Sequence, residues 1–597
     1  MFPIVVRCFI IPSVAVLACG LAMTNVHSQP PSSAVDHAIN SSTKNPTDQW
    51  VATDALGREL PTFEQVGPRR TDKVVGVFYY IWVGNHTKQV HDITEILKAE
   101  PGQRAWGDER AFHFWGQPEY GYHHASDPWV IRRDLQMLTN AGVDFLYFDT
   151  TNALIYEDTV TAVLTMSETM RAEGVATPDL CFTTNAKSGQ TMNRVYDAFY
   201  KNPRWKDHWF HWQGKPLILG QADDPQLRPN VKSFFTIKYS WAWTKTETEP
   251  NHWQWLDRSP QDYGWSHDPN VPEQIPVSTA QHPVSSRGKS FRNDKQPNVK
   301  ADYTTPFTDR GLHFQEQWNR AHAVDPPVVM VAQWNEWLAQ RFVYDGKTYK
   351  SKTYAGYPLE LGDSYFVDVF SREFNRDMAP MKGGYTDNYY YQLVSNIRKL
   401  KGMDRGEPRP EMQSISIDGK FSDWQSVSRI HYDPVNDTMH RSFQGTDPKT
   451  IYTNDSGRND IVECRTVHDP NYVYFTAVTK APLTKHTDRG WMFLLIDLDR
   501  KKATGWEGYE LLLTVAGQRS PTYRVLRWDD DTWIPVGVAE MAYRNNQLEL
   551  RIPTRLFAGS DGGFDFKWLD NPQHLDDATA FFLDGDAAPD RRFNYRY

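Results

Sequence analysis

Cysteine is scarce in this chain of 597 residues, which contains only Cys8, Cys19, Cys181 and Cys464. The first two fall in an apolar N-terminal run, and the other two are expected in different domains. A disulfide framework is therefore not expected, and two isolated cysteines exclude a cysteine-rich zinc cluster. The fold must depend on the size of its core, which a chain long enough for two or three domains can supply.

Runs of basic residues and long apolar runs are also lacking. The net charge is −9, which argues against nucleic acid or an anionic membrane surface as the main partner. The one apolar run, Cys8–Ala22, is too short and wrongly flanked to span a membrane. It predicts a signal peptide over residues 1–28 and a secreted or periplasmic protein. Lipoprotein anchoring through Cys19 is less favoured, because Leu17 stands where a small residue is usual.

Aromatic residues, by contrast, are abundant: 22 Trp, 29 Tyr and 30 Phe. Aromatic faces pack against the C–H faces of sugar rings, and Tyr and Trp add a polar group. A large core accounts for the total equally well. The tryptophans in polar loops, however, favour a carbohydrate-binding protein.

After a polar tail and lead-in over residues 29–72, predicted strands and helices alternate over residues 73–400. Several strands are nearly continuous apolar runs, as in parallel sheets covered by helices. Seven predicted strands occupy residues 74–80, 143–148, 180–185, 216–219, 234–239, 275–279 and 328–332. This rhythm favours an α/β fold, a (β/α)8 barrel of the TIM type. The eighth strand is not obvious, and a doubly wound open sheet is the alternative.

The texture changes after residues 401–412, a polar stretch with Pro and Gly that reads as a linker. Over residues 413–597, short strands with alternating polarity are separated by turn signals. This pattern predicts a C-terminal antiparallel β-sandwich.

Two carboxylates stand at the predicted strand ends, where function collects in a barrel. Glu336 follows an apolar strand and has tryptophans on both sides, so partial desolvation would raise its pKa and suit proton transfer. Asp149 directly follows the strand over residues 143–148. Glycoside hydrolysis typically needs two carboxyl groups flanking the scissile bond, so we predict Glu336 and Asp149 as the catalytic pair. A structural ion pair for Glu336 and a loop cap for Asp149 are the alternatives.

Other polar and aromatic residues lie at the strand ends and in the loop over residues 112–124. The adjacent His123 and His124 are only a weak metal signal, and no metal or cofactor is expected for catalysis. The predicted substrate-binding residues are Tyr80, Trp82, Trp115, Glu119, His123, Asn152, Asn185, Trp241, His282, Trp334 and Trp337.

Two of these segments, YYIWVGN at residues 79–85 and WNEW at residues 334–337, resemble the endo-α-mannosidase-like glycoside hydrolases of family 99. The related family 71 α-glucanases also look similar. Family 99 has a YYxWYGN-like loop after its first strand and an NEWHE-like motif late in its barrel. A strand beginning IPVS, at residues 275–283, also sits where that family has a comparable strand. The resemblance covers residues 74–342, and implies a (β/α)8 barrel that cleaves internal α-mannosidic bonds with retention.

The resemblance also exposes a departure. In the family, the first Glu of the motif acts on the neighbouring sugar 2-OH, and the second is the acid/base. Glu336 matches the first, but the second falls on Ala339, which cannot donate a proton. Another carboxylate must substitute. Asp149 is the first choice, and Glu119 or Asp127 could serve from the loop. The substrate is left open between a mannan and another α-linked, sulfated or anionic polysaccharide.

The C-terminal region resembles family 9-like carbohydrate-binding modules through its IDG, DW, DLD and TGW segments at residues 417–419, 423–424, 497–499 and 504–506. Such modules are β-sandwiches that often hold structural calcium. Asp497 and Asp499 offer suitable oxygen ligands, although a turn with two Asp residues is more often only a turn. Sugar contact and core packing are equally open for three tryptophans: Trp506, Trp528 and Trp533.

The sequence thus predicts a secreted glycoside hydrolase that acts on a polysaccharide or oligosaccharide, with an appended binding module. A second hypothesis is a non-catalytic polysaccharide-binding protein on a degenerate barrel, which Ala339 favours. A polysaccharide lyase is a third. A carbohydrate esterase has less support, because the chain contains no Gly-x-Ser-x-Gly elbow.

Overall fold

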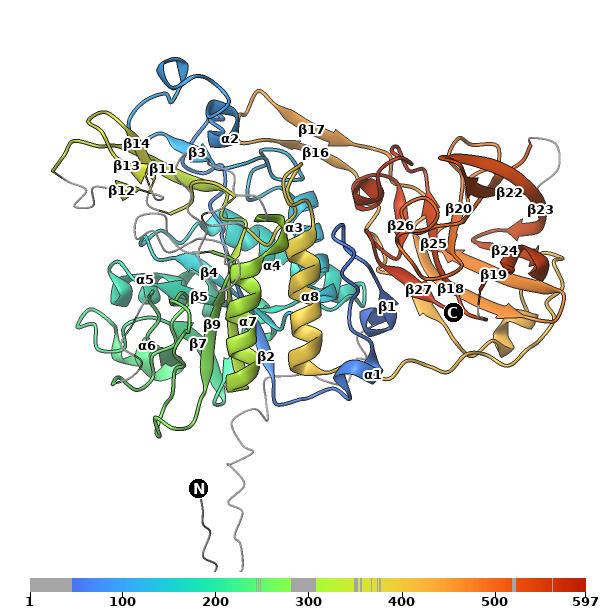
Figure 1. The fold of residues 1–597 in the computed structure, drawn as a ribbon. Helices are drawn as coiled ribbons and strands as arrows, with labels where there is room; N and C mark the ends of the chain where they lie inside the picture. Colours follow the sequence, from blue (N-terminus) through green and yellow to red (C-terminus); the bar gives the residue numbers. More distant parts are fainter. Residues whose placement is uncertain are drawn as a thin grey trace, which may run out of the picture.

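The structure is a computed structural model that describes residues 46–597, except 243, 245, 247, 281–307, 348–352, 355–356, 367, 373, 375–376, 518–521 and 561. The predicted signal peptide over residues 1–28 lies outside the described residues. Within the described part, no helix combines the length and the apolar character needed to cross a membrane. Two regions lie side by side, an α/β region and a β-rich C-terminal region (Figure 1).

The α/β region is built on a parallel sheet whose strands mostly follow one another in chain order. In the described part of the chain, the path runs β6-β7-β5-β4-β2-β10-β9, with β8 beside β7. Only β6 is antiparallel to its neighbour. The bounds are β2 (Val74–Tyr79), β4 (Phe145–Thr150), β5 (Asp179–Thr184), β6 (His211–Trp212), β7 (Lys215–Leu219), β8 (Thr236–Lys238), β9 (Gln274–Ser278) and β10 (Val328–Trp334).

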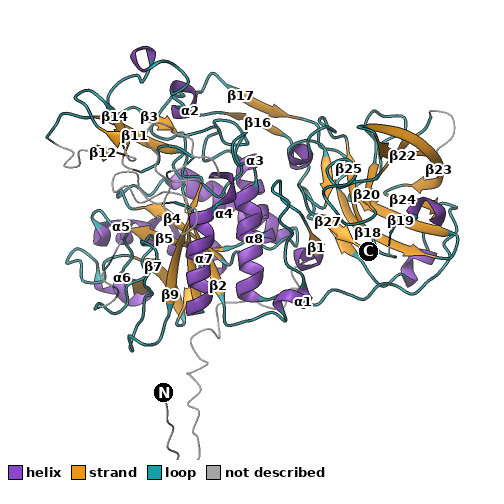
Figure 2. Ribbon diagram, viewed as in Figure 1, coloured by secondary structure: helices purple, strands orange, loops and turns teal. Residues whose placement is uncertain are grey.

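Helices pack around this sheet (Figure 2). Helix α3 (Pro128–Asn140) begins with residues that favour a helix start. Asp127 accepts a hydrogen bond from the Trp129 amide, and Pro128 occupies the first turn. The α-helices are α1 (Phe63–Val66), α2 (Ile93–Ile96), α3 (Pro128–Asn140), α4 (Glu157–Ala172), α5 (Ser188–Val195), α6 (Pro229–Phe234), α7 (Leu312–Val324) and α8 (Asn388–Lys401).

The alternation of strands and helices confirms a mixed α/β region, whereas the closed barrel stays a prediction. Among the described residues no ladder pairs β8 with β9. Instead, the chain between them forms isolated parallel bridges, Tyr239 to His252 and Ala242 to Leu256, beside and beyond the end of β8. This irregular segment occupies the place where a further strand was not obvious in the sequence.

A small antiparallel sheet follows β10, in the order β14-β11-β3. Its strands are β3 (Phe112–Phe114), β11 (Leu338–Val343) and β14 (Ser364–Phe366). A hairpin of β12 (Thr353–Tyr354) and β13 (Tyr357–Pro358) lies next to it in the chain. Since β11 begins two residues after Glu336, this small sheet fixes the chain on the far side of that residue.

The C-terminal region is β-rich, as predicted, and most of its described strands belong to one antiparallel sheet of twelve strands. Eleven of these strands lie on the path, and the twelfth, β26, pairs with β25 beside it. One strand of the path, β1 (Trp50–Val51), comes from the N-terminal lead-in and pairs with the last strand. The others are β15 (His431–Tyr432), β18 (Ile461–His468), β19 (Tyr472–Thr479), β20 (Phe493–Asp497), β21 (Leu511–Val515), β22 (Thr522–Asp529), β23 (Thr532–Arg544), β24 (Gln547–Pro553), β25 (Asp565–Asp570), β26 (Asp586–Ala588) and β27 (Asn594–Arg596).

A hairpin of β16 (Arg441–Gln444) and β17 (Ile451–Asn454) extends from the C-terminal region along the α/β region (Figure 1). The Tyr122 amide donates to the Tyr452 hydroxyl at 2.8 Å, and the Thr446 amide donates to the Tyr122 carbonyl at 2.8 Å. The two regions are therefore joined by an arm of one lying on a loop of the other. The predicted domain boundaries stay predictions.

Candidate active site

Glu336 lies two residues beyond the end of β10, in a sharp turn of the chain. Gln333 and Asn335 both have left-handed backbone, with φ of 94° and 68°, which is uncommon for residues other than glycine. Asp377 accepts the Glu336 amide at 2.5 Å, and the Trp115 indole donates to the Glu336 carbonyl at 3.0 Å. The backbone of Glu336 is thus held from two sides.

The Glu336 carboxyl is buried, with 3% of the residue exposed. Its Oε2 accepts a hydrogen bond from the Gln333 side-chain amide. Burial raises the pKa of Glu336 well above its usual value, and the charge of Asp368 raises it further. Hydrogen bonds from Gln333 and Tyr80 act in the opposite direction, and Asp149 adds a smaller increase. A carboxyl of this kind holds a proton at a pH where an exposed one is ionised.

Tyr80, which follows β2, is buried beside this carboxyl. Burial, and then the charge of Glu336 and that of Asp149, raise the pKa of the Tyr80 hydroxyl well above its usual value. The phenol therefore stays protonated and can donate to the Glu336 carboxyl. This brings together the ends of β2, β4 and β10, which are neighbours in the sheet.

Asp149, at the end of β4, has both carboxyl oxygens engaged. Its Oδ2 accepts from the Trp82 indole at 2.8 Å, and its Oδ1 accepts from the Thr151 hydroxyl at 2.7 Å and amide at 3.1 Å. Burial raises the pKa of Asp149, while the hydrogen bonds from Trp82 and Thr151 lower it. Asp149 thus acts on the pKa of Glu336 and also caps the following loop, which was the alternative for it. Its catalytic pairing with Glu336 stays a prediction.

Asp368 is a third carboxylate of this site, and sequence reasoning missed it. The β11–β14 ladder pairs Arg341 with Phe366 and Phe342 with Tyr365. Asp368 lies two residues beyond the end of β14, and its charge raises the pKa of both Glu336 and Tyr80. The signal was weak, because Asp368 follows a strand of only three residues that has no clear periodicity.

A second group of buried polar residues contacts the turn that contains Glu336. Asp134 on α3 accepts from the Tyr79 hydroxyl at 2.8 Å and from the Asn335 side-chain amide at 2.6 Å. Burial raises the pKa of Asp134 to about 6, and it raises that of Asp377 to about 8. Helix α3 is thereby tied to the backbone that presents Glu336.

Three predicted aromatic contacts are fully buried. The Trp115 and Trp337 rings stack with centroids 5.0 Å apart, and Trp334 packs edge-on against Tyr390 at 6.4 Å. At 0–1% exposure, these rings support the Glu336 turn. Their contact with a sugar stays a prediction. Trp82, at 9% exposure and fixed by Asp149, lies nearer to solvent.

The loop residues predicted to line a cleft instead connect the two regions. Glu119 forms a buried ion pair with Arg591, which occupies both of its carboxyl oxygens. Asp127 pairs with Arg441 at 2.8 Å while capping α3. His123 is buried, and this burial lowers its pKa to about 3. We therefore expect a structural role for all three.

The remaining predicted residues follow parallel strands along one edge of the sheet. Asn152 is exposed and donates to the Tyr156 hydroxyl at 2.5 Å. Asn185 is half-buried after β5. Trp241 is half-buried after β8 and meets Trp255 edge-on at 6.2 Å. His282 lies outside the described residues.

In the C-terminal region, Asp497 and Asp499 are joined by Glu510, and ligand oxygens of the three lie within 4.8 Å of one another. Burial, followed by the charge of Asp565, raises the pKa of Asp497 to about 8. An all-oxygen donor set of this kind fits calcium. The three tryptophans considered for sugar contact are half-buried, and two of them, Trp528 and Trp533, meet edge-on at 5.1 Å.

Comparison with known proteins gives little. No protein-family model matches the chain, and no curated protein matches it. A solved structure of the GH99 endo-α-mannosidase from Bacteroides thetaiotaomicron aligns over 55% of this chain and 97% of its own, at 16% identity and a TM-score of 0.29. The same enzyme in complex with bis-tris propane aligns over the same shares at 14% identity and a TM-score of 0.29. These values are too low to assign a shared fold or activity.

Proposed function

We propose that this protein is a glycoside hydrolase that cleaves an α-linked polysaccharide, with Glu336 as its proton donor. The observation that carries the proposal is a buried carboxyl at the end of a parallel strand, hydrogen-bonded to Gln333 and Tyr80, with two further carboxylates near it. Glycosidases use such a pair, in which one group is protonated and the other ionised.

The roles divide differently from those that the family resemblance implies. There, the residue matching Glu336 acts on a sugar hydroxyl. A carboxyl whose pKa is raised by burial and by Asp368 is instead suited to protonate the glycosidic oxygen. A neighbouring carboxylate then activates water or attacks the anomeric carbon as the bond to the leaving group breaks.

For this second carboxylate we favour Asp368, with Asp149 as the alternative. Both oxygens of Asp149 accept hydrogen bonds from Trp82 and Thr151, which suits a role as the cap of the following loop. Asp368 also has the larger influence on Glu336. It would supply, from the segment that follows β14, the carboxyl that the resemblance implies at Ala339.

Export, carbohydrate binding and calcium belong to the same proposal. The N-terminal sequence predicts secretion, where a mannan-like, sulfated or other anionic polysaccharide would be encountered. The half-buried Trp528 and Trp533 offer a surface for a sugar ring. Asp497, Asp499 and Glu510 would hold a structural calcium ion.

The test is to incubate the protein with α-mannans, α-glucans and sulfated fucans and to measure new reducing ends. The proposal expects reducing ends without unsaturated sugar rings on at least one of these polysaccharides. Products with unsaturated rings would identify a lyase. Binding without cleavage would favour a non-catalytic binding protein, the alternative that Ala339 supports.

A further inference from the structure

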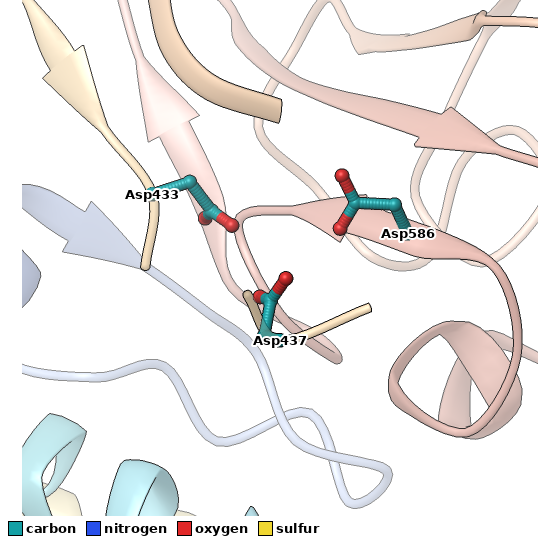
Figure 3. A group of neighbouring side chains, drawn as sticks. All are labelled: Asp433, Asp437 and Asp586. Atoms are coloured by element: carbon teal, nitrogen blue, oxygen red, sulfur yellow. The ribbon is translucent and has the colours of Figure 1, made fainter. Parts of the chain in front are cut away.

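Three aspartates meet in the C-terminal region, far from the Asp497 group in the sequence. Asp433 follows β15, Asp437 lies in the next turn, and Asp586 begins β26. Their side chains point toward one another (Figure 3). One ligand oxygen from each lies within 4.8 Å of the other two, and the residues are only 4–7% exposed.

Two oxygens of this group have no hydrogen-bond partner among the described residues, namely Asp433 Oδ2 and Asp437 Oδ1. The oxygens that do have partners accept from the Tyr595 hydroxyl at 3.1 Å, the Gln136 amide at 3.4 Å and the Ile461 amide at 2.6 Å. Buried polar atoms almost always have a partner. Two unpartnered carboxylate oxygens in one buried group therefore indicate a missing positive ligand.

A fourth carboxyl adds an independent sign. Asp460 is 8% exposed and lies against Asp437. Its Oδ2 accepts the Asn436 amide at 2.8 Å, while its Oδ1 has no partner among the described residues. Asp590 stands nearby, and its Oδ2 accepts from the side-chain amides of Gln136 at 2.6 Å and Asn140 at 3.3 Å.

The cationic side chains near the group have other hydrogen-bond or ring partners. Lys567 is buried and donates to the Pro589 carbonyl. Arg132 pairs with Glu173 at 2.7 Å, and the Arg133 guanidinium lies 3.5 Å from the centroid of the Trp129 ring. Lys480 and Arg591 also act on the group, but Lys480 donates to Asn436 and Arg591 pairs with Glu119. Among the described contacts, none of these five cations donates a hydrogen bond to Asp433, Asp437 or Asp586.

The geometry points to a binding site for a divalent cation of the calcium class, held by Asp433, Asp437 and Asp586, with Asp460 beside it. Calcium binds six to eight oxygens at roughly 2.3–2.6 Å and accepts irregular arrangements of carboxylates, carbonyls and water. Magnesium requires a more regular octahedron. A buried set of carboxylates from three separate segments fits the former better.

Such an ion would stabilise the contact between the C-terminal region and helix α3 of the α/β region. Gln136 on α3 contacts both Asp437 and Asp590, so the cation group lies directly against this helix. The same helix carries Asp134, which holds Asn335 in the Glu336 turn. The inference concerns assembly of the fold and does not depend on the proposed hydrolase activity.

The test uses the full chain, stripped with a chelator and titrated with CaCl₂, with bound metal and Tm as readouts. We expect Ca²⁺ to raise the Tm, and Asp437→Asn to bind one ion fewer than wild type. In chelator, Asp437→Asn should melt above wild type, because it removes repulsion among unpaired carboxylates. A purely structural role for Asp437 predicts a lower Tm.

Asp530→Asn, at an exposed turn outside both acidic groups, is the matched control and should bind as many ions as wild type. If Asp437→Asn does not fold, Asp433→Asn replaces it. No Ca²⁺ binding by wild type, or wild-type stoichiometry in both variants of this group, would overturn the inference. An equal response to MgCl₂ alone would overturn the calcium class.

Discussion

The molecule contains two groups of buried carboxyls that differ in how their oxygens are satisfied. Around Glu336 and Asp149, side-chain donors supply the hydrogen bonds. One buried oxygen of Asp433 and one of Asp437 have no hydrogen-bond partner among the described residues. Buried carboxyl groups in the two places are thus suited to different ligands. The first set is suited to hold and move a proton, and the second to hold a cation.

Their positions differ as well. The first group gathers at the ends of adjacent parallel strands, where loops can receive a substrate. The second lies at the contact between the antiparallel sheet and α3. We infer that the Glu336 group serves catalysis and the Asp433 group serves assembly of the two regions.

The largest effect is expected from Glu336→Gln, which keeps the shape of the side chain but cannot donate a proton. Polysaccharide turnover should fall by about 10³-fold, within the range of general acid catalysis. Reducing-end assays on matched amounts of folded protein measure this loss. Glu95→Gln, at an exposed pair with Lys98, is the control and should behave as wild type.

Glu119 represents a third kind of buried carboxyl, paired with an arginine of the protein itself. Glu119→Gln leaves the Arg591 charge buried without its partner, which costs about 3 kcal/mol of unfolding free energy. Chemical denaturation measures this change. Below the melting temperature, turnover should stay close to wild type. A loss of turnover with unchanged stability would instead return Glu119 to the catalytic candidates.

Asp368 and Asp149 should separate by the size of their effects. Asp368→Asn should lower kcat by about 10²-fold and Asp149→Asn by about tenfold, since only the former is proposed to act on the substrate. Steady-state kinetics on one polysaccharide compares them. The reverse order would restore the pair first predicted from the sequence.

The smallest effect concerns pH. Activity should fall as pH rises through the raised pKa of Glu336, because the proton donor is then ionised. The hydrogen bond from Tyr80 lowers that pKa. Tyr80→Phe should therefore raise it and move the alkaline limb of the kcat/KM profile to higher pH. A shift to lower pH would contradict the assigned contact.

The sequence was sufficient to predict elements that are marked by a continuous local pattern of apolar residues. Apolar runs predicted the parallel strands, whereas the catalytic pairing of Glu336 with Asp149, each just after such a run, stays a prediction. The C-terminal strands were likewise predicted by alternating polarity. These inferences succeed because hydrophobic periodicity is local and the carboxyl ends of parallel strands share an edge.

What the sequence did not predict depends on partners far apart in the chain. Glu119 meets Arg591, Asp433 meets Asp586, and β1 pairs with β27. Asp368 acts on Glu336 from the segment that follows β14. Residues of this kind have ordinary local surroundings, so tertiary packing alone brings them to a site.

The role of Glu336 as proton donor is tested most directly by varying the leaving group. Glu336→Gln would be compared with wild type on the active polysaccharide and on an aryl glycoside of the same sugar, whose phenolate leaves without protonation. If Glu336 is the proton donor, Glu336→Gln should lose most of its turnover on the polysaccharide and little of its turnover on the aryl glycoside. Equal losses on both substrates, or near-normal activity on the polysaccharide, would contradict it.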